Sequence, residues 1–292
     1  VVDAAGGLLM PGLVDGHAHL DKTLWGTPWH SHQAGPTLFD RIRNERRVLR
    51  ELDLSPQDQS EALVRHMVTR GTTHVRTHVD VAPDIGLRNL HGVLAMRAAQ
   101  RDLIDVQTVA FPQQGVMREA GTLDLLDQAV REGADVIGGL DPQGIDGDAA
   151  GQLNGLFAIA ARHGCGIDIH LHEHGEQGAH SIEMICERTA ALGLAGRVAI
   201  SHAFCLGMLD ERRLDPLLQR LARHDIAVMT HAPGGYTPFP PIRRLAEHGI
   251  RMFSGSDGVR DTCTPMNTAD MLQRAWLLAY NSGFRNDADL EQ

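Results

Sequence analysis

The stretch SPQDQSEALVRHMVTRGTTHVRTHVDV, residues 55–81, combines the two patterns that alternate along this chain. Its first part has the boundaries of a helix, with Ser55 as the candidate cap, Pro56 at the first helical position and Gly71 as the stop. The part that follows, residues 73–81, is rich in β-branched residues and is typical of a buried parallel strand. The stretch therefore predicts a helix that leads directly into a strand.

Similar strand-like runs recur along the whole sequence and are separated by segments with helical spacing. The strands are predicted at residues 12–19, 73–81, 105–112, 135–140, 166–172, 197–203, 226–232 and 250–256. The helices between and after them are predicted near 55–70, 87–101, 122–133, 149–163, 181–192, 209–224, 240–248 and 266–281. Eight alternations in one α/β chain are typical of a (β/α)8 TIM barrel. An open doubly wound sheet is the alternative, but it rarely needs so many units, and no G-x-G-x-x-G follows the first strand.

Composition limits the classes of partner. The 292 residues are 42% hydrophobic and 22% charged, which is typical of a globular protein, and no apolar run is long enough for a membrane span. The net charge of −10 disfavours binding to nucleic acid, whose affinity depends on clustered Lys and Arg. The four cysteines form no C-x-x-C pair, which argues against a disulfide framework and fits a reducing cytoplasm. We therefore expect a cytoplasmic protein with a small-molecule partner and no nucleic-acid or membrane partner.

The predicted barrel covers residues 12–292, and residues 1–11 form a separate segment or linker. Because the sequence opens in the middle of a strand-like pattern, we expect it to begin partway into a longer protein. The segment from Asp21 to Leu54 is too long for a simple connection and contains the helical pattern TLFDRIRNERRVLREL. An insertion on the catalytic side of a barrel usually shapes a pocket or an oligomer contact.

Polar residues occur repeatedly where the predicted strands end. In GLVDGHAHLD, His17 and His19 are two positions apart, so both side chains point to the same face of the first strand, the barrel interior. This pair alone equally describes two buried, hydrogen-bonded histidines. However, His170, His202 and Asp257 end three further strands, and the carboxyl ends of barrel strands converge. Together these residues are the donor set expected for Zn²⁺ or Fe²⁺ with an open position for water.

Several motifs carry a resemblance to a known family, in chain order and over nearly the whole sequence. They are PGLVDGHAHLDKT, THVRTHVDV, VAFPQQGV, GADVIGGLDP, SHAFC and GSDGVRD, and they resemble the cytosine deaminase branch of the amidohydrolase superfamily. Within that branch the sequence is similar to the enzymes that remove an amine from an s-triazine ring. The resemblance implies one divalent metal ion per chain, Zn or Fe, held by His17, His19, His170 and Asp257. It also implies a homo-oligomer, and it makes residues 1–11 the remnant of a small β-sandwich domain.

The resemblance also implies the catalytic roles. His202 and Asp257 would orient and deprotonate the metal-activated water, and Glu173 matches the family's proton shuttle to the ring nitrogen. Gln113 matches a residue that hydrogen-bonds the substrate ring. The alternative for Glu173 is an ion pair with a neighbouring histidine, His172 or His174.

Two features narrow the chemistry further. Lys22 is the only lysine of the chain, and the fourth strand ends in GGLDP, so a binuclear centre bridged by a carboxylated lysine is not expected. Lys22 itself is either a pocket residue or an ion-pair partner. Glu173 is the residue of cytosine deaminases, whereas Gly258 replaces their second acid. We therefore expect hydrolysis of the exocyclic C–N bond of a cytosine-like pyrimidine or an s-triazine, with a cyclic amidase or a noncatalytic metal-binding homologue as alternatives.

Overall fold

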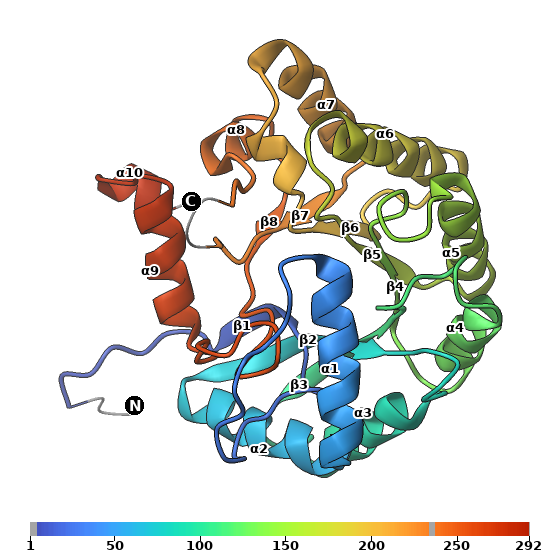
Figure 1. Ribbon diagram of the computed structural model, residues 1–292. Helices are drawn as coiled ribbons and strands as arrows, with labels where there is room; N and C mark the ends of the chain where they lie inside the picture. The colour runs from blue at the N-terminus through green and yellow to red at the C-terminus, as the bar shows by residue number, and fades with distance from the viewer. Residues whose placement is uncertain (1–4, 234–236, 292) are drawn as a thin grey trace.

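Eight parallel strands lie side by side in chain order in the part of the chain that the structure, a computed structural model, describes, residues 5–233 and 237–291 (Figure 1). They are β1 (Leu13–Ala18), β2 (Thr72–Asp80), β3 (Asp105–Phe111), β4 (Val136–Leu140), β5 (Gly166–His170), β6 (Val198–Ser201), β7 (Ala227–Met229) and β8 (Met252–Phe253). Helices cover the outer side of this sheet. The predicted (β/α)8 TIM barrel is confirmed, and the open doubly wound sheet is not formed.

The last strand meets the first through hydrogen bonds beyond the end of β8. The Gly16 N–H donates to the Ser254 carbonyl at 2.9 Å, and the Asp257 N–H donates to the His17 carbonyl at 2.8 Å. Gly255 makes this approach possible, because a Cβ at that position would lie 2.5 Å from the backbone of His17. The closure brings Asp257 next to the end of β1.

The outer helices follow the predicted alternation. They are α2 (Pro56–Thr69), α3 (Arg88–Ala99), α4 (Thr122–Arg131), α5 (Ala149–His163), α6 (Gly175–Ala191), η1 (Phe204–Gly207), α7 (Glu211–Arg223), α8 (Ile242–Glu247), α9 (Met271–Asn281) and α10 (Asp287–Leu290). The prediction of a helix starting at residue 181 was wrong at its boundary, because α6 begins at Gly175. This first turn includes Gly178, which lets the helix pack closely on Cys205, where a Cβ would lie 2.7 Å from the Cys205 side chain.

The insertion between β1 and α2 forms a helix of its own, α1 (Leu38–Leu52), at the open end of the barrel (Figure 1). Thr37 caps it, and Asp40 completes a capping box by bonding back to the Thr37 backbone. Its buried residues, Ile42 and Glu45, face inward, and both line a pocket. The insertion thus takes the first of its two predicted roles, shaping a pocket.

The ends of the chain contribute little regular structure. Residues 5–12 contain a turn but neither helix nor strand, and residues 1–4 of the predicted 1–11 segment lie outside the described residues, as do residues 234–236 and 292. In Figure 1 the N-terminal segment leads away from the barrel on the side of α9. Among the described residues, no helix is both long and apolar enough to span a membrane.

Candidate metal and catalytic site

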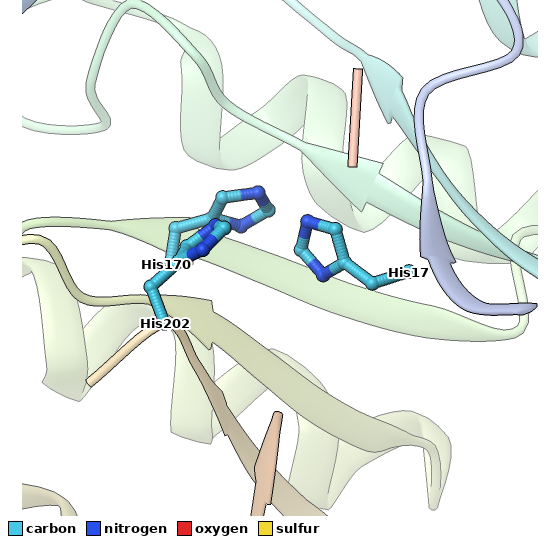
Figure 2. Close-up of side chains that lie close together, drawn as sticks. All are labelled: His17, His170 and His202. Carbon is cyan, nitrogen blue, oxygen red and sulfur yellow. The ribbon is translucent and has the colours of Figure 1, made fainter. Parts of the chain in front are cut away.

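The strand-end histidines meet inside the barrel. Ligand atoms of His17, His170 and His202 lie within 4.8 Å of one another, and so do those of His17, His19 and Asp257. Figure 2 shows the imidazoles of His17, His170 and His202 turned toward one another from β1, β5 and the end of β6. The five predicted residues therefore divide into two overlapping groups that share His17.

Several nitrogens of these imidazoles are buried without a hydrogen-bond partner. They include Nε2 of His17, Nε2 of His202, Nδ1 of His19 and both ring nitrogens of His170. Burying a polar atom without a partner is costly, and native proteins rarely leave several such atoms together. A divalent ion can accept one lone pair from each ring and so satisfy one buried nitrogen of each histidine, and in this respect the residues present fit a metal.

The protonation of the histidines also suits metal binding. Burial lowers the pKa of His19 to about 3 and lowers the pKa values of His170 and His202 well below the usual range. Neighbouring positive or imidazole groups act in the same direction. These rings are therefore neutral at pH 7 and keep the lone pair that a metal ligand needs.

Asp257 lies opposite the histidines. Its Oδ1 is 3.3 Å from His19 Nε2 and 3.6 Å from His17 Nε2. Burial opposes the charge of Asp257, but its contacts with the two histidines hold the pKa of this carboxyl well below its usual range. Asp257 is an anion that faces the orphaned imidazoles.

The predicted proton shuttle and its neighbour point in different directions. The Glu173 carboxylate accepts hydrogen bonds from the N–H groups of Gln143 and Gly144, both at 2.8 Å, and from the Ser181 hydroxyl. It therefore faces the loop after β4. Neither His172 nor His174 pairs with it, so the alternative of an ion pair with a neighbouring histidine was wrong.

His172 instead pairs with Asp141 and lines the pocket. Asp141 Oδ2 lies 3.0 Å from His172 Nδ1, and Oδ1 accepts the His172 backbone N–H. Burial opposes protonation of His172, but the Asp141 carboxylate outweighs it and raises the pKa of this imidazole. The ring stacks on His202, with the two centroids 4.5 Å apart. His172 is thus a hydrogen-bonding group beside the orphaned imidazoles, and Asp141 favours its protonated form.

The opposite wall of the pocket holds a buried ion pair. Lys22 Nζ lies 3.3 Å from Glu45 and 3.5 Å from Asp80, and it donates to the Gln113 side-chain oxygen. The Gln113 amide nitrogen donates to Glu45 at 2.5 Å. Burial opposes the charge on Lys22, but Asp80 and Glu45 raise its pKa. Lys22 therefore takes both of its predicted roles, pocket residue and ion-pair partner.

The pocket between these walls has a volume of about 260 Å³. Its polar lining includes five predicted or candidate groups, namely His19, Gln113, His170, His202 and Asp257, while Leu38, Ile42, Phe111 and Leu140 supply apolar walls. His17 is fully buried beneath the pocket. A small apolar cavity with a few converging polar groups is the usual form of a site for one small ring.

Some residues of the site were not predicted. His231, just after β7, lies 3.1 Å from His202 between their Nδ1 atoms, and its Nε2 is 3.9 Å from Asp257. The signal was available, since His231 follows a predicted strand as His202 does. Asp141 after β4 had the same signal. No sequence signal marked Glu45, because a helical pattern does not show which residue faces a distant pocket.

The histidines of β2 take separate roles. His78 is fully buried among the site imidazoles, with its ring centroid 4.0 Å from that of His17. His74 is exposed and pairs with Asp105. His78 thus packs inside the barrel, and Asp80 belongs to the Lys22 ion pair.

Several known proteins are similar to this chain in sequence or in structure. The protein YahJ of Escherichia coli (strain K12) is 36% identical over 280 residues, which cover 95% of this chain and 60% of YahJ. The N-isopropylammelide isopropylaminohydrolase of Burkholderia multivorans ATCC 17616 is 49% identical, with a TM-score of 0.92 over 96% of this chain and 71% of that one. The 5-methylcytosine deaminase of Klebsiella pneumoniae is 25% identical, with a TM-score of 0.85 over 100% and 75%.

The chain therefore spans less than two thirds of YahJ and about three quarters of the two enzymes. A sequence profile of the amidohydrolase family matches residues 1–279, nearly the whole chain. The eight-stranded barrel and the histidines at its strand ends agree with that match. This chain belongs to the amidohydrolase family.

Proposed function

We propose that the protein is a metal-dependent aminohydrolase that hydrolyses the exocyclic C–N bond of an amino-substituted nitrogen heterocycle and releases ammonia or an alkylamine. The observation that carries this proposal is the group of orphaned imidazole nitrogens at the floor of a small pocket. The solved relatives support it, since one is an isopropylaminohydrolase and the other a methylcytosine deaminase.

The proposed ligands of one divalent ion, Zn or Fe, are His17, His19, His170 and Asp257. Neutral imidazoles and a carboxylate suit either metal. When bound, such an ion lowers the pKa of a water in its coordination sphere from about 15.7 toward about 7. Hydrolysis at neutral pH then needs no strong base from the protein.

The proposed role of His202 and Asp257 is to orient the attacking water and take up its proton. The free Nε2 of His202 and the ionised Asp257 carboxylate both accept protons. The attack is on the ring carbon that carries the amine. Asp257 then returns its proton to the departing nitrogen, and the C–N bond breaks to release the neutral amine. The proton of the new hydroxyl group would pass to Glu173, which has given its own proton to the ring nitrogen, and the ring is left in its keto form.

Two residues are proposed to act on the substrate ring, one by proton transfer and one by a hydrogen bond. Glu173 is the proposed shuttle to the ring nitrogen, and it must turn from the loop after β4 to reach the pocket. His172 already faces the pocket and is held there by Asp141. Its proposed role is to donate a hydrogen bond that stabilises negative charge on the ring during attack.

The Lys22 wall is proposed to recognise the ring. Lys22 is a cationic donor that suits a ring carbonyl oxygen, and Glu45 is an acceptor that suits an adjacent ring N–H. Gln113 lies between them and keeps its proposed role as a substrate-binding residue. An O=C–N–H edge of this kind occurs in oxidised triazines and pyrimidines, which are the proposed substrate class.

The test is to purify the full-length protein, measure metal per chain and screen aminated triazines, pyrimidines and pterins for amine release. We expect one catalytic metal per chain and an amine product with an intact ring. An acyclic carboxylate without released amine would instead identify a cyclic amidase. Bound metal with no turnover on any heterocycle would indicate a noncatalytic homologue.

A further inference from the structure

A chain of hydrogen-bonded side chains leads from His17 across the barrel interior. His17 Nδ1 lies 3.0 Å from the Ser201 hydroxyl, and that hydroxyl donates to Asp168 Oδ1 at 2.6 Å. The other Asp168 oxygen accepts from Arg76 Nη1 at 2.8 Å. His17, Ser201 and Asp168 have no exposed surface, and the four residues come from β1, β6, β5 and β2.

The direction of each hydrogen bond follows from what each group can donate. Arg76 is always cationic and bonds Asp168, so Asp168 pairs with it as a carboxylate that only accepts. Ser201 has a single proton and gives it to Asp168, so its oxygen accepts from His17. His17 must then carry its proton on Nδ1, which leaves the lone pair on Nε2.

The Nε2 atom of His17 is the one that faces the site. It has no hydrogen-bond partner and lies 3.6 Å from Asp257 Oδ1. His78 packs on the same ring without a hydrogen bond to it. Neither nitrogen of His78 has a hydrogen-bond partner, although its Nε2 lies 3.8 Å from Asp168 Oδ2. Ser201 is therefore the group that decides which nitrogen of His17 holds the proton.

We propose that Ser201, Asp168 and Arg76 are positioning residues that fix His17 in the Nδ1–H tautomer and thereby set the affinity of the site for a divalent ion. The proposal rests on the proposed function, because it concerns the metal that the function requires. Partners behind the ligands of a metal orient these ligands, and their loss typically weakens metal binding by about 10-fold to 100-fold.

The last residue of this hydrogen-bonded chain, Arg76, is partly exposed to solvent at the end of the barrel opposite the substrate pocket. Arg76 has a side chain that is 26% exposed, and it lines a cavity of about 1200 Å³ at the amino ends of the strands. Arg251 lines the same cavity but pairs with Asp225 at 2.8 Å, away from the site. Arg76→Gln and Arg251→Gln therefore form a matched pair of variants that leave the substrate pocket untouched.

The experiment measures the Zn²⁺ dissociation constant of the purified protein by competition with a chelating dye. We expect Ser201→Ala and Asp168→Asn each to weaken Zn²⁺ binding by about 10-fold to 100-fold. Arg76→Gln should weaken it in the same direction, whereas Arg251→Gln should leave it unchanged. Ser201→Thr, which keeps the hydroxyl group, should bind Zn²⁺ with an affinity close to that of the wild type.

A second measurement reads the tautomer directly. The nitrogen-15 chemical shifts of His17 in the metal-free wild type, assigned by comparison with His17→Gln, should report a protonated Nδ1 and an unprotonated Nε2. A proton on Nε2, or wild-type affinity in Ser201→Ala, would overturn the proposal. Should the Ser201 and Asp168 variants fail to fold, the wild-type tautomer and the Arg76→Gln affinity decide. A wild type that binds neither Zn²⁺ nor Fe²⁺ refutes the proposed function and the claim about metal affinity, and the tautomer then decides only whether Ser201 fixes the proton of His17. Metal binding by the wild type that is unchanged in Ser201→Ala overturns the present proposal and leaves the proposed function standing.

Discussion

Replacing Asp141 by asparagine tests whether the pairing of His172 matters for the chemistry. The new side chain can keep its carbonyl oxygen on the backbone N–H groups of His172 and Glu173, which now bond Asp141 Oδ1. However, its amide would face His172 Nδ1 with a donor, where the aspartate offers an acceptor at 3.0 Å. The loop should therefore stay in place while the imidazole loses the partner that favours its protonated form.

The size of the effect follows from the bond that is lost. A hydrogen bond to a charged group contributes about 1.5–3 kcal/mol, and each 1.36 kcal/mol corresponds to about tenfold in rate. We expect kcat for amine release to fall by about 10-fold to 100-fold. Metal content should not change, because Asp141 bonds His172 and Glu173 and neither of these is a proposed ligand.

The assay is steady-state amine release with the substrate found in the screen, together with metal analysis of each preparation. Asp146→Asn is the matched control, since Asp146 lies in the same loop and accepts the backbone N–H of Val116 without contacting His172. An Asp141→Asn enzyme with kcat equal to that of the control would refute a role for His172 in the reaction.

Three further perturbations have defined outcomes. Lys22→Met leaves the Glu45 carboxylate buried without its cation and should lower the free energy of unfolding, measured in urea, by about 3 kcal/mol or more. Adding Glu45→Gln to this variant should restore part of the lost stability. Equal stability of the single and double variants would contradict the stabilising role of the ion pair. Burial raises the pKa of Asp261 from 3.8 to about 6, so the folded state prefers the neutral acid, and stability from this group is present below about pH 4 and lost as the pH rises through 6. The free energy of unfolding of the wild type, measured in urea at several pH values, should therefore fall by up to about 3 kcal/mol relative to that of Asp261→Asn between pH 4 and pH 7. A difference between the two proteins that stays constant with pH would contradict this prediction. Glu173→Gln should keep the metal and lose turnover by about 100-fold or more, whereas near-normal turnover would rule out the shuttle role.

The barrel and the proposed metal ligands were predictable because both depend on simple periodicities. Side chains two positions apart in a strand share a face, which places His17 and His19 together. Parallel strands in a barrel bring their carboxyl ends to one place, which adds His170 and His202 from distant parts of the chain. This prediction does not depend on any loop conformation. In the structure, ligand atoms of His170 and His202 lie within 4.8 Å of His17 and of each other, and those of His19 lie within 4.8 Å of His17 and Asp257.

The proposed catalytic groups beyond the strand ends were harder to place, for a physical reason. β5 ends at His170, so the alternation of side chains no longer applies to His172 and Glu173. Their directions depend on the loop after β4, whose N–H groups hold Glu173 while its Asp141 holds His172. Hydrogen bonds between two loops have no sequence period, and so the sequence pointed to Glu173 and left His172 as its possible partner.

The backbone conformation of three residues at the site bears on their proposed roles. Asp141, His202 and Asp257 each follow a strand and each has a positive φ, of 34°, 71° and 61°. Such left-handed conformations cost a non-glycine residue on the order of 1–3 kcal/mol, and glycine would adopt them freely. At all three positions the chain has instead a residue that can ligate a metal or move a proton. Positive φ at a non-glycine residue also occurs away from the site, at Asp53 and Asp225 for example, so the conformation alone does not mark a pocket. At His202 and Asp257 it coincides with side chains that line the pocket beside the orphaned imidazoles, and there the rest of the barrel must hold the residue against its own conformational preference.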